Sequence, residues 1–493
     1  MSRIVPEAGC TRCLIRQVLP CVLALIVFAG LCQLATELTP LSPNEVEGAK
    51  PTSLLTLQGF GATREGRREL TFPALSDETA WARLPTRVRG EAAPLPLWAR
   101  TLAPSLPRTT AAMLELDYAH RAGSPLDPKL RGQIRWAAAQ AIHSDYGKAY
   151  ALADLRAAQV GEDEIRLLTG DSDSLPDETR QMLAFVRKLS TAAVTLTDEE
   201  VAHLVSRHGE KQVVAIVFCV AYCNFLDRLT LALNLSVEPG GPLPPLEVRF
   251  ERRWPAIDPI PSDSARLHID SLLSLRPIDF LRPLSAEGLR DPDWNTAELT
   301  GIRCNLTARK ARQSRIALPA TDPTANRWGL VGQTYQPAMA VAWSACTQAF
   351  AEEADQDPVF EQSLFWVVTR TKQCFYCMGH TEMMLVVAGL DSKAINDRVQ
   401  LLAGGDWSSL PVAERVALQF AHKQANNPAA IEPRDVRALL EVYGQLRALD
   451  VIWWSCRCNY MMCIADAFLL PLEEINVFDG FDPKIMRLSD PGK

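Results

Sequence analysis

The chain has 493 residues, of which 47% are hydrophobic and 22% charged, and its formal net charge is −7 at pH 7. This composition leaves ample apolar surface for large cores, so it excludes a largely disordered chain. The acidic balance and the lack of a long basic block argue against a nucleic-acid-binding protein. The chain has 13 cysteines. Because this number is odd, they do not all pair with one another, and their spacing has to indicate their roles.

An apolar segment without charges runs from residue 18 to residue 35, after three arginines. This arrangement is typical of a secretory signal or an uncleaved signal anchor. The one small-residue cleavage candidate, Ala35, is a weak match, which favours an uncleaved anchor over residues 1–36. We therefore expect a membrane protein held by one N-terminal helix, with its bulk outside the cytoplasm. The alternative is a secreted or periplasmic protein.

Two Pro-containing stretches are predicted to be connections. Residues 37–93 are mixed in composition and are interpreted as a tether with little core of its own. Residues 239–330 begin with closely spaced prolines, which remove backbone donors and stop helices. This second stretch has no sustained helical period and is expected to connect two domains. A short tail, residues 481–493, follows the last helical segment.

The two remaining segments, 94–238 and 331–480, are similar to each other. A single constant offset along the chain aligns several identical residues, among them Phe185 and Phe420, Lys188 and Lys423, Val201 and Val436, Leu204 and Leu439, Gly209 and Gly444, Cys223 and Cys458, and Asn224 and Asn459. Both segments show helical periodicity with short turns and no strand alternation. The sequence therefore predicts an all-α fold with two tandem repeats.

The second repeat carries a cluster of residues suited to thiol chemistry. Cys374 and Cys377 are three residues apart, and His380 is three residues further on, so one helix face can hold all three. In such a dithiol, one thiolate attacks an oxidised substrate and the other resolves the product as a disulfide. A neighbouring His or a helix N-terminus favours the thiolate. Glu361, on the preceding helix, is expected to orient His380 as a proton acceptor.

This cluster resembles the alkylhydroperoxidase D-like branch of the carboxymuconolactone decarboxylase superfamily. The shared features are Glu361, the segment Cys374-Phe375-Tyr376-Cys377, His380 and the helix end Gly389-Leu390. Two spacings depart from the family pattern. Two residues rather than three separate Cys377 from His380, and Glu361 lies one residue further upstream than is usual.

The resemblance implies two alkylhydroperoxidase D-like domains with an antioxidant activity, as a thiol-dependent peroxidase or disulfide oxidoreductase. In that scheme Cys377 is the activated thiolate, and Cys374 exchanges with a protein thiol reductant. Catalysis would require no metal or organic cofactor. The substrate would be a peroxide or a disulfide, and the helical units would assemble into a homo-oligomer.

The first repeat lacks the thiols at the corresponding place. The segment Ser144-Asp145-Tyr146-Gly147 lies where Cys-x-Tyr-Cys is expected. We therefore predict that this repeat is catalytically silent and serves as a packing partner. His143 and Asp145 are interpreted as part of a solvated helix start rather than as the remnant of a site.

Other roles for the cysteines stay open at this point. A structural zinc ion needs four ligands, and Cys456 or Cys458 could join Cys374, Cys377 and His380. A structural disulfide is a second alternative, since an exported domain permits one. Core packing is the expected role of the cysteines on two apolar helices, namely Cys219, Cys223, Cys456, Cys458 and Cys463.

Two functional alternatives also stay open. One is a lyase that acts on a small lactone acid, as in the founding activity of the superfamily. The other is a non-catalytic helical protein that uses its repeats for assembly.

Overall fold

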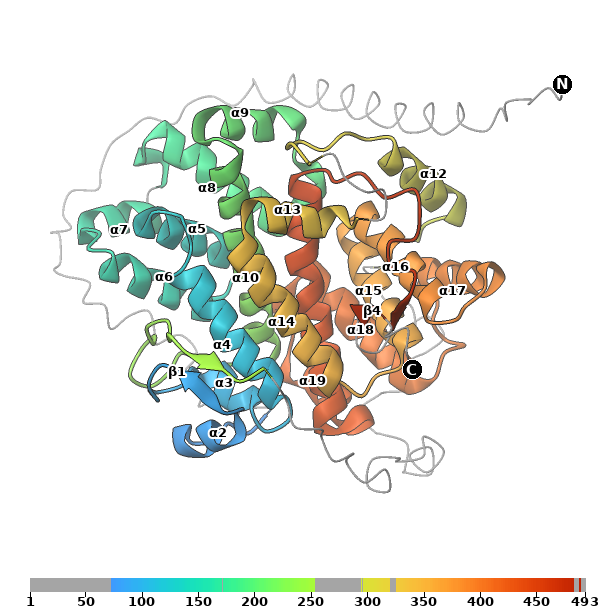
Figure 1. Cartoon of the computed structure of the whole chain (residues 1–493), viewed down its shortest axis with the longest axis horizontal. Helices are drawn as coiled ribbons and strands as arrows, with labels where there is room; N and C mark the ends of the chain where they lie inside the picture. Colours follow the sequence, from blue (N-terminus) through green and yellow to red (C-terminus); the bar gives the residue numbers. More distant parts are fainter. Residues whose placement is uncertain are drawn as a thin grey trace, which may run out of the picture. The chain divides into compact units, whose positions relative to one another are not determined.

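The computed structural model describes residues 72–170, 172–252, 294, 296–319, 325–482 and 487–488. Within these residues the chain is predominantly α-helical, with two pairs of very short strands (Figure 1). The all-α prediction is therefore confirmed. The predicted signal anchor, residues 1–36, lies outside the described residues, so it stays a prediction.

The first half of the fold is a series of helices that ends in a long apolar one. They are α3 (Leu97–Leu102), α4 (Pro107–Arg121), α5 (Pro128–Ala141), α6 (Asp145–Ala157), α7 (Glu162–Thr169), α8 (Asp177–Ala192), α9 (Asp198–His208) and α10 (Glu210–Ala232), with short 3-10 turns at Ser172–Ser174 and Ala193–Thr195. Ser144 caps α6, and Thr197 forms a capping box at α9. These side chains satisfy backbone N–H groups that have no partner inside the helix.

The second half contains a similar series. Its helices are α13 (Arg327–Tyr335), α14 (Pro337–Glu353), α15 (Pro358–Lys372), α16 (Phe375–Val387), α17 (Ser392–Gly404), α18 (Val412–Asn426) and α19 (Pro433–Ala467), with a 3-10 turn at Pro428–Ala430. Proline occupies the first helical position of α14, α15 and α19. Proline is favoured there because its missing N–H would be unpaired in any case.

The two halves follow the same order of helices. The starts of α4, α5, α6 and α7 are spaced along the chain in the same way as the starts of α14, α15, α16 and α17. Gly444, with φ 71°, interrupts α19 at the place where Gly209, with φ 76°, separates α9 from α10. A duplicated helical unit would produce this recurrence. The tandem-repeat interpretation stays a prediction.

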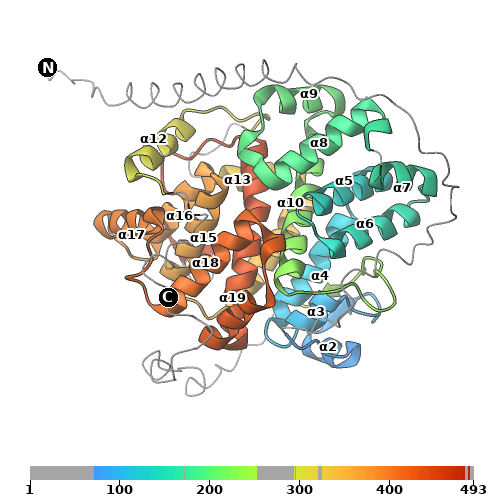
Figure 2. The ribbon, with the colours of Figure 1, turned by 180° about the vertical axis from the view of Figure 1, so that it is seen from behind.

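The core is formed where corresponding helices of the two halves meet. Helix α10 packs along α19, and α4 packs along α14 (Figures 1 and 2). The rings of Phe350 and Trp453 stack there at 4.0 Å between centroids. The described residues of both halves therefore lie within one compact unit.

Helix α10 is the one described helix that is long and apolar enough to span a membrane. Its apolar stretch is completely buried inside the structure. A helix that is apolar on all sides is expected at the centre of a large core. Here α10 is accordingly a central core helix.

Parts of the predicted connections are folded. The predicted tether contains α2 (Asp77–Arg83) and β1 (Arg87–Arg89), and the predicted connector contains β2 (Arg249–Phe250) and α12 (Leu299–Lys310). Strands β1 and β2 pair with each other, as do β3 (Phe481–Asp482) and β4 (Arg487–Leu488). Ser76 caps α2, and the Trp81 indole donates to the carbonyl oxygen of Ala93. The contacts of Ser76 and Trp81 join residues that are close together in the chain. A short folded element therefore forms in a segment whose mixed composition had suggested a tether.

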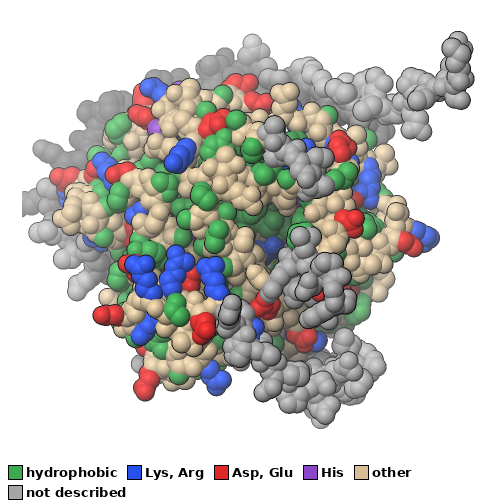
Figure 3. All heavy atoms as spheres, viewed as in Figure 1, with side chains coloured by type: hydrophobic (Ala, Val, Ile, Leu, Met, Phe, Trp, Pro, Cys, Tyr) green, Lys and Arg blue, Asp and Glu red, His purple; other side chains and the backbone are tan. Residues whose placement is uncertain are grey.

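Lys and Arg side chains gather over the region of β1 and β2 (Figure 3). The exposed arginines of these strands and their flanks are Arg87, Arg89, Arg249 and Arg252. Arg89 pairs with Glu247, whereas Arg249 and Arg252 both pair with the buried carboxylate of Glu115. The positive charges of this surface are therefore partly neutralised by acidic partners.

Candidate functional site

The two motif cysteines lie at a sharp turn between α15 and α16. Helix α15 ends at Gln373, whose backbone is left-handed with φ 59°, and the N–H of Cys374 donates to the carbonyl oxygen of Thr369. This pattern is a Schellman-type helix end. Cys374 is then the N-cap residue of α16, and Cys377 lies in the first turn. The turn thus brings both cysteines to the N-terminus of one helix.

The thiols of Cys374 and Cys377 are not in a disulfide and interact with each other. Their exposed fractions are 0% and 1%. Burial raises the pKa of Cys374 well above its usual value, and the hydrogen bond with Cys377 and the nearby Asp466 raise it further. The arrangement is a buried, reduced dithiol.

Asp466, at the end of α19, adjoins Cys374. Burial raises the pKa of Asp466 to about 6, and this rise is limited by Arg309 and by Cys374. The Arg309 guanidinium lies 3.1 Å from an Asp466 carboxylate oxygen. A carboxylate that titrates close to neutral pH beside a thiol can exchange a proton with it.

A second acidic group holds His380. The Nε2 atom of His380 lies 2.6 Å from Glu473, whose other carboxylate oxygen accepts hydrogen bonds from the Tyr376 hydroxyl and the Arg327 N–H. All these carboxylate partners are donors. Burial would raise the pKa of Glu473, but the hydrogen bond and charge of His380, with the backbone N–H of Arg327, lower it to about 2. Glu473 is therefore an ionised partner for the imidazole.

The carboxylate that contacts the Nε2 atom of His380 is Glu473, and not Glu361 as predicted from the sequence. The role of Glu361 stays a prediction. Glu361 lies on α15, where its charged neighbours are Asp450 and Arg457. Burial, followed by the charge of Asp450, raises the pKa of Glu361 to about 8. The four predicted site residues thus fall into two places, with the thiols and His380 on α16 and Glu361 on the preceding helix.

The thiol site is closed by the covering segment, residues 468–482, which follows α19. Its Leu472 occupies the space next to Gly379, where a side chain would collide with it. Phe478 meets the His380 ring edge-on at 4.9 Å between centroids, and the Asn476 amide donates to the carbonyl oxygen of Met383. The covering segment therefore packs directly on α16 and supplies Glu473.

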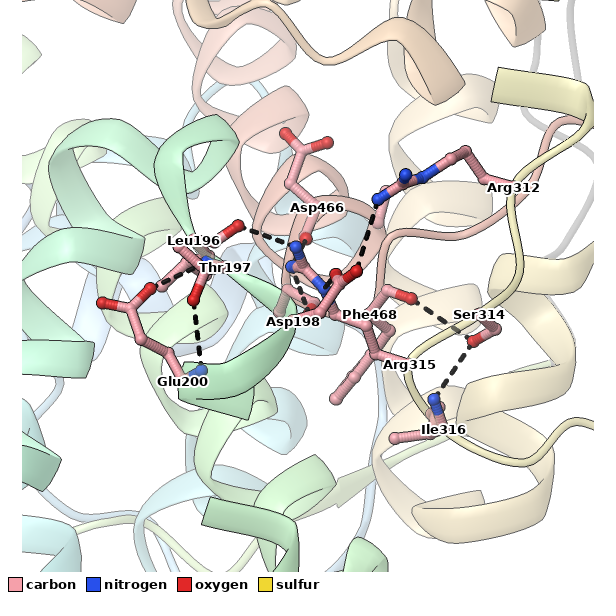
Figure 4. A network of polar contacts seen from close by, with 12 residues as sticks. Leu196, Thr197, Asp198, Glu200, Arg312, Ser314, Arg315, Ile316, Asp466 and Phe468 are labelled. Carbon is pink, nitrogen blue, oxygen red and sulfur yellow. Dashed lines mark hydrogen bonds and ion pairs between the residues drawn. The ribbon is translucent and has the colours of Figure 1, made fainter. Parts of the chain in front are cut away.

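Hydrogen bonds from residues 309–316 connect the covering segment with the end of α19. The Arg309 guanidinium donates a hydrogen bond to the carbonyl oxygen of Leu470. The backbone N–H of Arg315 donates to the carbonyl oxygen of Phe468. The Arg315 guanidinium donates to the carbonyl oxygens of Asp466 and Ala467. Figure 4 shows that Arg315 also reaches Leu196 and Asp198 of the first half. The environment of the second-half thiols thus depends on both halves.

The first half has a related site without thiols. Ser144 occupies the N-cap position of α6 as Cys374 occupies that of α16, and Gly147 takes the place of Cys377 in the first turn. The Asp227 carboxylate fills the space next to Gly147 that a side chain would need. His143 and Asp145 are exposed, in keeping with a solvated helix start. This half carries no dithiol at the corresponding position.

The remaining cysteines of the apolar helices are buried, as expected for core residues: Cys219, Cys223, Cys456, Cys458 and Cys463. Cys456 accepts a hydrogen bond from the Gln424 amide, and Cys458 donates to the carbonyl oxygen of Trp454. Within the described ranges, no three His, Cys, Asp or Glu side chains are arranged to hold a metal ion. The zinc alternative therefore gains no support from the geometry.

Glu473, Asp466 and Arg457 were not identified as candidates from the sequence. The constant offset between the repeats would have paired Glu473 with Glu238, since both follow a long apolar helix. Arg457 was detectable as a lone charge in the apolar run between Asp450 and Asp466. No comparable signal marked Asp466.

No protein-family model matches the chain, and neither does any curated protein. The functional assignment therefore has to rest on the residues of the site.

Proposed function

We propose that this chain is a thiol-dependent peroxidase or disulfide oxidoreductase, similar to the alkylhydroperoxidase D-like branch of the carboxymuconolactone decarboxylase superfamily. The observation that carries the proposal is the reduced Cys374–Cys377 pair at the start of α16, next to the buried His380–Glu473 pair. A dithiol at a helix N-terminus with an adjacent imidazole has the components of thiol redox chemistry.

In the proposed reaction, Cys377 is the attacking thiolate. Its sulfur attacks the terminal oxygen of a hydroperoxide, the O–O bond breaks, and Cys377 becomes a sulfenic acid while an alcohol leaves. The Cys374 thiol then displaces water from that sulfenic acid and forms the disulfide. A protein dithiol returns the pair to the reduced state by disulfide exchange.

His380 is assigned the transfer of the thiol proton. Glu473 lies 2.6 Å from its Nε2 atom, which fixes the orientation of the ring. Glu473 thus takes over the orienting role that the sequence predicted for Glu361.

We further propose that the two halves arose as tandem domains, since their helices recur in the same order. Residues 1–36 would anchor the chain, with the dithiol outside the cytoplasm. Assembly into a homo-oligomer and a protein thiol reductant complete the proposal.

The test is peroxide consumption by the purified full-length protein with a dithiol reductant. Cys377→Ser is expected to abolish consumption, because the attacking sulfur is lost. The matched control is Cys346→Ser on α14, another fully buried cysteine, which should retain turnover. Unchanged consumption by Cys377→Ser would contradict the proposal.

The burial of both sulfurs favours a second candidate function, a non-catalytic helical assembly protein. In that case Cys374 and Cys377 would resist alkylation in the native protein and would not cycle between thiol and disulfide. Mass spectrometry after exposure to peroxide and then to reductant distinguishes the two candidates.

A further inference from the structure

Arg457 is an arginine held in the apolar interior of α19. Its exposed fraction is 5%. The guanidinium lies 4.3 Å from the centroid of the Trp454 ring and 5.9 Å from that of Phe365. These two aromatic rings hold the charged group by cation–π contact and keep it out of solvent.

The guanidinium has unused hydrogen-bond donors. Its Nε and Nη1 atoms are buried and have no hydrogen-bond partner among the described residues. Arg309 differs, because its guanidinium donates to Leu470, Ala465 and Asp466. A buried donor without a partner costs free energy, and such groups are rare unless a ligand or a reacting group uses them.

One acid and three thiols act electrostatically on Arg457. They are Cys458, Glu361, Cys346 and Cys377. Cys377 acts electrostatically on Cys374 and Tyr376 in its own segment, and on Arg457, Cys458 and Cys463 of α19. Among these five residues, Arg457 is the one with a positively charged side chain.

We infer that Arg457 is a catalytic residue of the thiol reaction, whose guanidinium donates hydrogen bonds to the Cys377 thiolate and to the hydroperoxide oxygen that it attacks. The inference rests on the proposed function. Arginine suits this role, because it stays charged at all physiological pH values and its planar group can donate to two atoms at once.

The chemistry balances without a further reactant. Cys377 loses its thiol proton, its sulfur bonds to the terminal oxygen, and the O–O bond breaks. The alkoxide that leaves takes up the proton that the thiol released. Arg457 would stabilise the negative charge as it moves from sulfur to the departing oxygen.

The experiment measures two rates on the full-length protein in a Cys374→Ser background. The first is alkylation of Cys377 by iodoacetamide as a function of pH, and the second is the formation of sulfenic acid with hydrogen peroxide. Arg457→Met keeps the length and apolar contacts of the side chain but removes the charge. We expect both rates at pH 7 to fall at least about tenfold, with half-maximal alkylation moved to higher pH.

The matched control is Arg131→Met in the first half. Arg131 is also buried, with an exposed fraction of 9% and an Nε atom without a partner. It lies in the half where Ser144 and Gly147 replace the thiols, so both rates should stay at their starting values. A natively folded Arg457→Met protein with an unchanged alkylation profile would overturn the inference.

Arg457→Lys covers the case in which Arg457→Met does not fold. Lysine keeps the charge but not the planar pair of donors, so alkylation should stay close to the starting rate while the peroxide reaction slows. An undiminished peroxide rate in Arg457→Lys would overturn the inference. The proposed function is tested separately by Cys377→Ser. If this variant consumes peroxide at an unchanged rate, the proposed function itself is contradicted.

Discussion

Glu238 and Glu473 hold corresponding positions in the two halves, under the same offset that aligns Phe185 with Phe420. Each carboxylate accepts a backbone N–H at the first helix of its half and a tyrosine hydroxyl, from Tyr146 and Tyr376 respectively. The third partner differs. Tyr150 donates to Glu238 at 2.9 Å, whereas Glu473 holds His380.

This comparison predicts different effects for the two carboxylates. Glu473→Gln and Glu238→Gln should each destabilise the fold by on the order of 2 kcal/mol, because each removes a buried charge that accepts several hydrogen bonds. Only Glu473→Gln should lower peroxide turnover, by about tenfold or more, since His380 loses its ionised partner. Denaturant unfolding and steady-state kinetics measure the two effects. An equal loss of turnover in both variants would assign Glu473 a purely structural role.

Cys374→Ser should leave the first chemical step intact and block the second. After treatment with peroxide, sulfenic acid should accumulate at Cys377, where dimedone labelling and mass spectrometry detect it. Cys377→Ser serves as the control and should show no sulfenic acid in this segment. Labelling at Cys374 in that control would mean that the roles of the two thiols are reversed.

Asp450 should make the stability of the fold depend on pH. Burial raises its pKa to about 8 in the folded protein, compared with roughly 3.9 in an unfolded chain. Between these values the folded state holds a proton that the unfolded state lacks, so stability falls as the pH rises through about 8.

Asp450→Asn removes this proton uptake. Relative to the starting protein, the variant should gain more than about 1 kcal/mol on going from pH 5.5 to pH 9. Part of the pH dependence should persist, because the pKa of Glu361 is also raised to about 8. Urea unfolding at both pH values measures the change, with the exposed Asp163→Asn as a control. Identical pH profiles for Asp450→Asn and the starting protein would contradict the burial of an ionisable Asp450.

The first-half site should not tolerate a side chain at Gly147. A β-carbon there collides with the Asp227 carboxylate, so Gly147→Ala should cost about 1–3 kcal/mol. The cost should be smaller in an Asp227→Ala background, where the collision is absent. Gly161→Ala is the control, because no atom lies near its β-carbon position. Strict additivity of the Gly147 and Asp227 changes would argue against the collision.

The helix breaks at Gly209 and Gly444 should each depend on glycine. Both residues have positive φ, and neither has an atom near its β-carbon position, so the cost of alanine comes from the backbone alone. Gly209→Ala and Gly444→Ala should each lower the stability by about 1–3 kcal/mol. Gly404→Ala, in open space without positive φ, should be close to neutral. A thermal melt compares the three variants.

Sequence patterns predicted the helices and the place of the dithiol, because both are local properties. The spacing of Cys374 and Cys377 was sufficient to place them on one helix, and Ser144 and Gly147 marked the corresponding turn in the first half. Helical periodicity also identified α10 and α19, although it could not show that they pack together.

The partner of His380 could not be found in this way. Glu473 lies 93 residues further along the chain, in irregular backbone where no periodic pattern predicts which side chain points inward. Glu361 was the nearer acidic residue on a predicted helix, but its carboxylate faces Asp450 and Arg457. Long-range packing decides between such candidates, and it is not encoded in local spacing.

The close approach of Asp227 to Gly147 limits which side chains position 147 can carry. A cysteine at position 147 would first need the Asp227 carboxylate to move away, and loss of Asp227 alone would leave a gap beside Ser144. A thiol at this place would therefore require changes at both Gly147 and Asp227. Packing, and not only the residue at position 147, keeps a thiol pair like that of the second half out of the first turn of α6.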